Sequence, residues 1–366
     1  MKSVVTEVDL TLIDALRLAP RASWAQLSAV LRVSPDTLAR RWARLTEQGC
    51  AWAGALPLGA GETGLCAAWL EVDCVPGQAD VTATALVDDP GNLFVAHVTG
   101  RADLLAQVIR PDPADIDRYV TERVHRLPGV RATRLRLITS VYGRVPPGPH
   151  GRLTPAQRGR LVELGPQPAR GAFRVEAPDR AGRRLLLALA EDARRSAAAL
   201  AEQCGLSEST VRRRLETMER GPAFQYVCKV APRYSGRPVW ALIGARVPPA
   251  EIPTASSALT RLRGTRTVTT VTGPYNLAVC AWLTSPGGLT DFTQAATRLV
   301  PRMRVDDTTI ALRHRKLGAH VLSAEGLNER FVPPDVWMDA ETFGRRMSPS
   351  VAGNGRDGGE NGDHRA

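Results

Sequence analysis

The sequence predicts an α+β protein made of two fused copies of one unit, each a winged-helix-like helix-turn-helix followed by a ferredoxin-like β-α-β-β-α-β domain. Three observations predict this fold: an internal repeat at a fixed spacing, a helical pattern at the start of each repeat, and a strand-rich pattern after it. A chain of 366 residues also exceeds what one hydrophobic core usually organises. We therefore expect several domains.

The internal repeat organises the chain. Residues 21–45 align with residues 194–218 without a gap, and matching positions lie 173 residues apart. The same spacing carries Val98-Thr99-Gly100 onto Val271-Thr272-Gly273. A register kept over that distance indicates a duplicated unit rather than chance similarity.

Composition separates the two copies from a linker and from the end of the chain. Residues 144–172 hold six Pro, five Gly and five Arg against one Glu, which suits a basic linker rather than a packed core. Within the linker, Thr154 followed by Pro155 predicts a short helix. We expect helix-turn-helix domains at 6–52 and 178–230, ferredoxin-like domains at 65–143 and 238–318, the linker at 144–172, and a disordered tail at 344–366.

The first helix-turn-helix is predicted from apolar residues at helical spacing. Residues 9–18 and 23–31 form two short helices, and a third runs over residues 34–48. On the third helix Trp42 and Leu45 are expected to face inward. The second copy repeats this arrangement.

The outer faces of both third helices carry hydroxyl and guanidinium groups. Arg can bond guanine bidentately in the major groove, while other side chains hold phosphates. Basic faces are common on single solvated helices, but recurrence after a matching pair of helices favours double-stranded DNA as the partner. Replacing Arg213 and Arg214 by Ala is expected to weaken DNA binding far more than it lowers stability. Candidate DNA contacts are Ser34, Thr37, Arg40, Arg41, Arg44, Ser207, Ser209, Thr210, Arg212, Arg213 and Arg214.

After each helix-turn-helix the pattern changes to short strands separated by helices. Copy one predicts strands at 66–75, 93–99, 103–109 and 131–142 with helices at 78–88 and 113–127, and copy two predicts strands at 239–247, 266–272, 276–284 and 305–314 with helices at 249–262 and 287–300. The order β-α-β-β-α-β is that of a ferredoxin-like fold.

The middle strands of each sheet domain join at a glycine hairpin. Glycine accepts positive φ, and the polar residue three positions on offers a carboxylate or amide able to hold a zwitterion such as an amino acid. The same pattern is also common in plain turns. Candidate effector-binding residues are Gly100, Arg101, Asp103, Gly273, Tyr275 and Asn276.

The string R-A-S-W-x-x-L-x-x-x-L-x-V-S-x-x-T-x-x-R-R, followed by V-T-G-x-x-D-L-L in the sheet domain, resembles the Lrp/AsnC family of transcription factors. Two family units would cover about residues 6–337. The resemblance implies major-groove recognition helices, homo-oligomers formed through the sheet domains, and an effector amino acid at the Gly-x-x-Asp hairpin, here Gly100, Asp103 and Gly273. Asn276 stands where the second acid belongs, which removes the charge that would pair with an ammonium group. Because the two copies are fused, they are expected to form within one chain the dimer that two separate units form in the family.

The two copies differ at the turn of the helix-turn-helix. Gly205 suits the left-handed conformation that such turns need, whereas Arg32 in copy one is either strained by about 1 kcal/mol or part of a different turn. Because copy one keeps the acid Asp103, we hypothesise a division of labour. DNA contact would be weighted to the second unit and ligand sensing to the first.

The motifs do not indicate an enzyme. The G-x-G-x-x-G at 59–64 precedes a predicted strand instead of opening a helix, which argues against a dinucleotide site. Two alternatives stay open. Siroheme decarboxylases resemble the same family but do not need arginine-rich recognition faces, and a nucleoid-organising protein with little sequence preference would carry the same residues.

The net charge indicates the class of partner, and the cysteine spacing bears on metal and disulfide sites. Lys+Arg 48 against Asp+Glu 37 gives a formal charge of +11, which favours nucleic acid, although an arginine-rich genome gives the same excess. The six cysteines form no C-x-x-C pair, so neither metal, disulfide nor cofactor is expected. Without an apolar run of roughly 18 residues or an apolar start, we expect a cytoplasmic, nucleoid-associated protein with no membrane partner.

Overall fold

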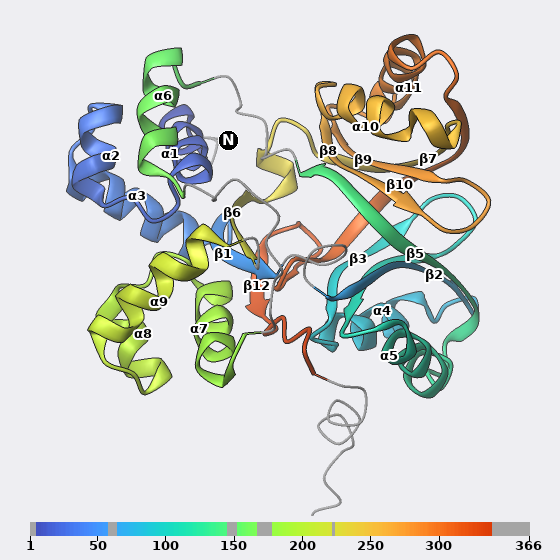
Figure 1. Ribbon diagram of the computed structural model, residues 1–366, viewed down its shortest axis with the longest axis horizontal. Coiled ribbons are helices and arrows are strands. Elements are labelled where there is room, and N and C mark those ends of the chain that lie inside the picture. The colour runs from blue at the N-terminus through green and yellow to red at the C-terminus, as the bar shows by residue number, and fades with distance from the viewer. Residues whose placement is uncertain (1–4, 58–63, 145–151, 167–177, 222–223, 339–366) are drawn as a thin grey trace, which may run out of the picture.

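Two helix-turn-helix units lie on one side of the molecule and two sheet domains on the other (Figure 1). The computed structural model describes residues 5–57, 64–144, 152–166, 178–221 and 224–338. The predicted tail at 344–366 lies outside the described residues, as does most of the Gly-rich segment at 59–64.

Each helix-turn-helix consists of three helices, as predicted. They are α1 (Glu7–Leu18), α2 (Trp24–Leu31) and α3 (Pro35–Glu47) in the first unit, and α7 (Arg180–Glu191), α8 (Ala197–Cys204) and α9 (Glu208–Arg220) in the second. A side-chain oxygen caps the first turn of each helix by accepting a hydrogen bond from a backbone amide. The capping residues are Thr6, Ser23, Ser34, Asp179, Ser196 and Ser207.

The described part of the linker contains helix α6 (Pro155–Leu164), which confirms the predicted short helix. It packs on the first helix-turn-helix: Leu153 and Leu161 are buried in that core, and Gln157 Nε2 donates to Val30 O over 3.2 Å. The expectation that 144–172 lacks packed residues is therefore wrong for this part. Its leucines supply an apolar face that the overall Pro and Gly content conceals.

A strand follows each helix-turn-helix, and neither strand was predicted. Strand β1 (Ala51–Pro57) pairs antiparallel with β6 (Phe224–Val230), so the strand of one copy pairs with that of the other. Neither strand folds back as a hairpin beside its own recognition helix, and the winged-helix-like part of the prediction is wrong. The pairing partner lies more than 150 residues away in the chain, so local sequence patterns do not show it.

Each sheet domain has the predicted β-α-β-β-α-β order. Its elements are β2 (Cys66–Cys74), α4 (Ala79–Asp88), β3 (Asn92–Val98), β4 (Leu104–Arg110), α5 (Pro113–Arg118) with a π-helical turn (Tyr119–Val124) and β5 (Val130–Arg144), then β7 (Val239–Arg246), α10 (Ile252–Thr260), β8 (Thr265–Val271), β9 (Leu277–Leu283), α11 (Gly288–Leu299) and β10 (Arg304–Leu317). Two short unpredicted strands, β11 (His320–Leu322) and β12 (Asn328–Phe331), extend the sheet at β10.

The two sheet domains join into one barrel-like sheet. Eight strands pair in the closed order β10-β3-β4-β2-β5-β8-β9-β7, with β7 pairing back to β10. The joints are related by the repeat: Ile138 faces Val271 where β5 meets β8, and Ala311 faces Val98 where β10 meets β3. These four residues form two pairs 173 residues apart, so the chain makes a symmetric pair with itself.

The helices and the barrel enclose separate apolar cores. Helices α4 and α5 cover one half of the sheet, and α10 and α11 cover the other (Figure 1). A further apolar core lies between the two halves and contains Trp69, Phe94 and Trp240. The inner faces of both sheet domains therefore meet in the middle of the molecule.

Candidate DNA-recognition and effector sites

The candidate recognition helices α3 and α9 begin in the same way. Ser34 Oγ accepts the Thr37 amide at 3.3 Å and donates to Thr37 Oγ1 at 2.7 Å. Ser207 holds Thr210 with the same two bonds, at 3.2 and 2.8 Å. These hydroxyls fix where each recognition helix begins.

Exposed arginines that form no ion pair with the described residues occur in both recognition helices: Arg40 in α3, and Arg213 and Arg220 in α9. Arg40 and Arg213 occupy equivalent positions of the repeat. Arg40 Nε reaches only the carbonyl of Asp36, one turn earlier, at 3.4 Å. Both guanidinium groups are free to bond bases or phosphates.

The neighbouring arginines of α3 are held by the buried carboxylate of Asp9. Arg41 Nη1 donates to Asp9 Oδ1 at 3.0 Å and Arg44 Nη2 to Asp9 Oδ2 at 2.7 Å. Burial raises the pKa of Asp9, but hydrogen bonds from Thr6 and the two arginines outweigh this and hold the pKa below its usual value. Arg41 and Arg44 are about one-third exposed, with side-chain values of 32% and 37%, because these hydrogen bonds draw them toward Asp9. Their contact with DNA stays a prediction.

We call this arrangement, in which a carboxylate binds arginines of the recognition helix, the clamp. Copy two repeats the clamp with a different acidic residue. Arg214, the equivalent of Arg41, makes two 2.9 Å bonds to the carboxylate of Asp179, which caps α7. Arg212 instead pairs on the surface with Glu208, and Ser209 Oγ lies 3.1 Å from Ser207 Oγ. Replacing Arg214 therefore removes an ion pair within the domain as well as a candidate DNA contact, and the expectation that DNA binding falls more than stability stays a prediction.

The turn before each recognition helix is left-handed in both copies. Arg32 adopts φ 57° and ψ 38°, close to the φ 64° and ψ 42° of Gly205. Of the two possibilities that the sequence left open, Arg32 takes the strained one. It is the single non-glycine residue with positive φ in the described part of the chain.

The polar residue of each glycine hairpin forms hydrogen bonds with the backbone of its own sheet domain. Asp103 Oδ2 accepts the backbone amide of Cys74 at 2.7 Å. Asn276 makes the equivalent bond to the amide of Val247 at 3.0 Å and donates back to Val247 O at 2.7 Å. Because Asn accepts this amide as well as Asp does, the Asp-to-Asn difference between the copies is compatible with the same fold.

The surroundings of the two hairpins differ. In copy two, Tyr275 is buried, its ring occupies the space beside Gly244, and the Arg136 guanidinium lies 4.9 Å from the ring centre. In copy one, the position equivalent to Tyr275 is the half-buried Ala102, and the atom nearest the missing Cβ of Gly100 lies at 3.7 Å, against 3.6 Å for Gly273. The copy-one hairpin therefore differs chiefly in lacking the aromatic ring that is buried in copy two.

A cavity of about 620 Å³ lies between the two halves of the barrel and the β1–β6 pair. Trp69, Phe94, Trp240 and Trp282 line it with aromatic surface, and the Trp240 and Phe94 ring centres are 4.4 Å apart. The described residues that line this cavity include six basic residues and no acidic one. The basic residues are Arg17, Lys229, Arg237, Arg261, Arg263 and Arg266.

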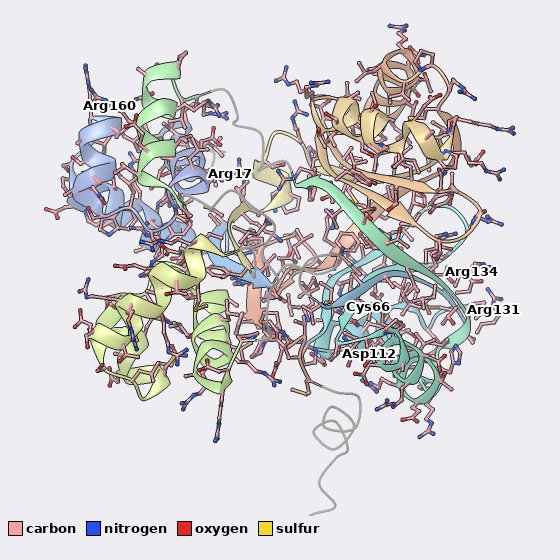
Figure 2. All side chains as sticks on the ribbon, in the orientation of Figure 1. Arg17, Cys66, Asp112, Arg131, Arg134 and Arg160 are labelled. Carbon is pink, nitrogen blue, oxygen red and sulfur yellow. The ribbon has the colours of Figure 1, made fainter. Side chains whose placement is uncertain are left out.

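Sequence reasoning missed this cavity because its walls come from both copies. Arg17 reaches it from the inner side of the first helix-turn-helix (Figure 2), where its Nε donates to Cys228 O on β6 at 3.2 Å. Lys229 interrupts an otherwise largely apolar strand, and that interruption was the available sequence signal. Its side chain points to the cavity rather than to solvent.

Other kinds of site find no support in the part of the chain that the structure describes. No three His, Cys, Asp or Glu residues are grouped to hold a metal ion, and the six cysteines are unpaired. None of the described helices is both long enough and apolar enough to cross a membrane.

Comparison with known proteins identifies both kinds of domain. The AsnC-type helix-turn-helix domain model matches residues 5–46 and 179–219, and the Lrp/AsnC ligand binding domain model matches residues 67–145. The chain is 26% identical over 149 residues to an HTH-type transcriptional regulator of Pyrococcus horikoshii and equally to one of Pyrococcus abyssi. Each match covers 39% of this chain and 94% of the relative, so the relatives correspond to about one unit.

These matches define a DNA-binding helix-turn-helix protein of the class that regulates transcription. The chain belongs to the Lrp/AsnC family and carries the family's helix-turn-helix twice.

Two solved structures of the siroheme decarboxylase NirDL resemble nearly the whole chain. Their TM-scores are 0.54 and 0.55, and they cover 86% and 87% of this chain and 93% and 96% of NirDL at 13% identity. One of them holds an iron-uroporphyrin III analogue. At this identity the likeness shows a shared fold, including the tandem arrangement.

Proposed function

We propose that the chain is a sequence-specific DNA-binding regulator whose two recognition helices both contact the duplex and whose sheet domains respond to a small effector such as an amino acid. Arg40 and Arg213 carry the DNA part of this proposal, because each is exposed at the same position of a helix whose other face is buried. The strand order within each sheet domain further supports a ferredoxin-like fold.

The DNA contact is tested by replacing Arg40 and Arg213 together with Ala. DNA recovered by genome-wide mapping of bound fragments serves as the probe, and affinity is measured by fluorescence anisotropy at several salt concentrations. We expect at least about tenfold weaker binding and, where both contacts are to phosphate, a salt slope lower by roughly 2. Arg298→Ala, an exposed arginine on α11, is the matched control and should bind normally.

The same measurement separates specific regulation from general nucleoid organisation. A regulator should prefer the mapped fragments over random DNA by at least about a thousandfold, whereas an organiser should bind both alike. Wild-type affinity in the double variant at moderate salt would contradict recognition by these helices.

The effector part is tested at the hairpin of copy one. Because Asn276 already holds the equivalent amide in copy two, Asp103→Asn should fold normally. If the Asp103 charge pairs with an amino-acid ammonium group, this variant should lose amino-acid binding in calorimetry while Asn276→Asp keeps or gains it. Equal amino-acid binding by wild type and Asp103→Asn would remove the proposed role of Asp103.

A second candidate, a siroheme-decarboxylase-like enzyme, is favoured by the likeness to NirDL over 86% of the chain. Addition of iron-uroporphyrin III should then give a saturable change in its absorption spectrum and, with siroheme, a decarboxylated product. Specific DNA binding together with an unchanged tetrapyrrole spectrum would exclude this candidate.

A further inference from the structure

The central cavity contains basic groups that no acidic side chain of the described protein neutralises. Lys229, Arg237, Arg263 and Arg266 line it, and none of them forms an ion pair with a described residue. The Arg266 Nη1 atom is buried and has no hydrogen-bond partner. Lys229, Arg237 and Arg266 are half-buried and Arg263 is exposed, so the buried Nη1 atom of Arg266 is the group that most lacks an acceptor. Leaving such an atom unpaired is costly, which points to a ligand that supplies the missing acceptor.

The basic groups come from separate parts of the cavity wall. Lys229 Nζ lies 3.1 Å from the Cβ position at Gly318, whereas Arg237 Nη1 lies 3.2 Å from that at Gly264, the residue after Arg263. Cationic groups in separate parts of one wall match two acidic groups on one molecule better than a single anion.

Aromatic rings line the same space. The indole and phenyl rings of Trp69, Phe94, Trp240 and Trp282 come from the inner faces of both sheet domains. A volume of about 620 Å³ is that of a small-molecule site, and rings in such a wall favour flat aromatic partners.

We propose that this cavity binds a flat aromatic molecule that carries at least two acidic groups, such as an aromatic dicarboxylate. The site is distinct from the two glycine hairpins. It draws on both copies of the unit, so it exists only in the fused or paired form.

The position of the cavity connects such a ligand to the recognition helices. Leu56 and Pro57 of β1 line it together with Lys229 of β6, and these paired strands directly follow the two helix-turn-helix units. Resting on the proposed function, we infer that the ligand changes the relative placement of the units and hence DNA affinity. Binding to the cavity itself does not depend on that function.

The binding test uses the full chain and 2,6-naphthalenedicarboxylate as the probe, measured by isothermal titration calorimetry. We expect one site per chain, and at least about tenfold weaker binding of the uncharged dimethyl ester. Lys229→Met and Arg266→Met should each weaken the dicarboxylate at least about tenfold, while Arg298→Met on the outer surface of α11 should have no effect. No binding at millimolar probe, or equal binding by Lys229→Met and wild type, would overturn the proposal.

Two further measurements separate a lost ligand contact from misfolding of the variant, and a failure of the cavity proposal from a failure of the proposed DNA-binding function. Thermal unfolding without probe should show Lys229→Met at least as stable as wild type, because the variant removes a half-buried charge that has no ion-pair partner among the described residues. Clear destabilisation together with lost binding would mean a structural role for Lys229 and would overturn the assignment. DNA affinity is measured separately without probe. Intact DNA binding with no probe binding would defeat only the cavity proposal, and the reverse result only the proposed function.

The pH dependence gives an independent signature. Burial, and then Arg266, lower the pKa of Lys229 to about 7, and the uncharged histidines His314 on β10 and His320 on β11 also face this lysine. Since the dicarboxylate binds the charged lysine, its affinity should fall as pH rises from 6 to 9 in wild type. Lys229→Met should show a flatter profile, and a wild-type profile without slope would contradict the role of Lys229.

Discussion

The buried carboxylate of Asp9 shows how one side chain can organise a DNA-reading surface. Its side chain is fully buried and accepts hydrogen bonds from Arg41, Arg44 and the backbone and hydroxyl of Thr6. The clamp fixes α3 against α1. Arg40, which the clamp does not hold, keeps its guanidinium outside.

We expect Asp9→Asn to lower the free energy of unfolding by about 2 kcal/mol at pH 7, because it breaks charged hydrogen bonds whose arginines are partly screened by water. The pKa of Asp9 lies below its ordinary 3.8 in the folded protein. Its stabilisation is thus present above pH 3.8 and is lost as pH falls through the lower, folded value. Urea unfolding at pH 7 and pH 3 measures this difference.

The exposed acid Asp117 on α5 provides the control. Asp117→Asn should change the free energy of unfolding by less than about 0.5 kcal/mol at either pH. An Asp9→Asn variant as stable as this control would show that the clamp contributes nothing to the first unit.

Sequence patterns located the arginines of the recognition helices but not their roles. Helical spacing places Arg40, Arg41 and Arg44 near one face, yet it does not reveal that Asp9 on another helix takes two of them. The same limit applies to Asp103, whose carboxylate is bound to the Cys74 amide. A residue's partner is set by tertiary packing, which periodicity does not contain.

At the scale of elements, the turn before each recognition helix allows a test in both directions: glycine can be introduced in copy one and removed in copy two. Arg32 is exposed and left-handed, so Arg32→Gly should raise the free energy of unfolding by up to about 1 kcal/mol. Gly205→Ala should lower it by about 1 kcal/mol, since no atom lies within 4 Å of the added Cβ and only backbone strain is introduced. Denaturant unfolding of both variants measures the pair, and stabilisation by Gly205→Ala would refute the strain argument.

The strands and helices of the sheet domains could be predicted because each has its own pattern. Eight predicted strands and four predicted helical segments occur within a few residues of their expected bounds. Strands β1 and β6 could not be predicted, because β1 is buried almost throughout, β6 mixes buried and half-buried residues, and neither alternates clearly. Each is fixed by pairing with the other copy. The cavity residues Lys229 and Arg266 escaped prediction for the same reason.

At the scale of the whole molecule, fusion makes the two copies neighbours but allows them to diverge. The hypothesised division of labour stays a prediction: each recognition helix has an exposed arginine at the same position, while only the copy-two hairpin contains a buried tyrosine. The central cavity adds asymmetry, because its basic residues come mostly from the second copy and its aromatic rings from both.

The closed strand order implies that the connection between the copies is not needed to hold them together. The copies share three strand joints, β1–β6, β5–β8 and β10–β3, and helix α6 adds packing on the first unit. We expect a protease site inserted between residues 166 and 178 to be cut without separating the pieces. Size-exclusion chromatography with light scattering should show one 1:1 complex of unchanged mass, because dissociation would expose the edges of three strand pairs and the central apolar core. Separation of the pieces under native conditions, with the uncut protein intact, would show that the ring is held by the connection rather than by its strand joints.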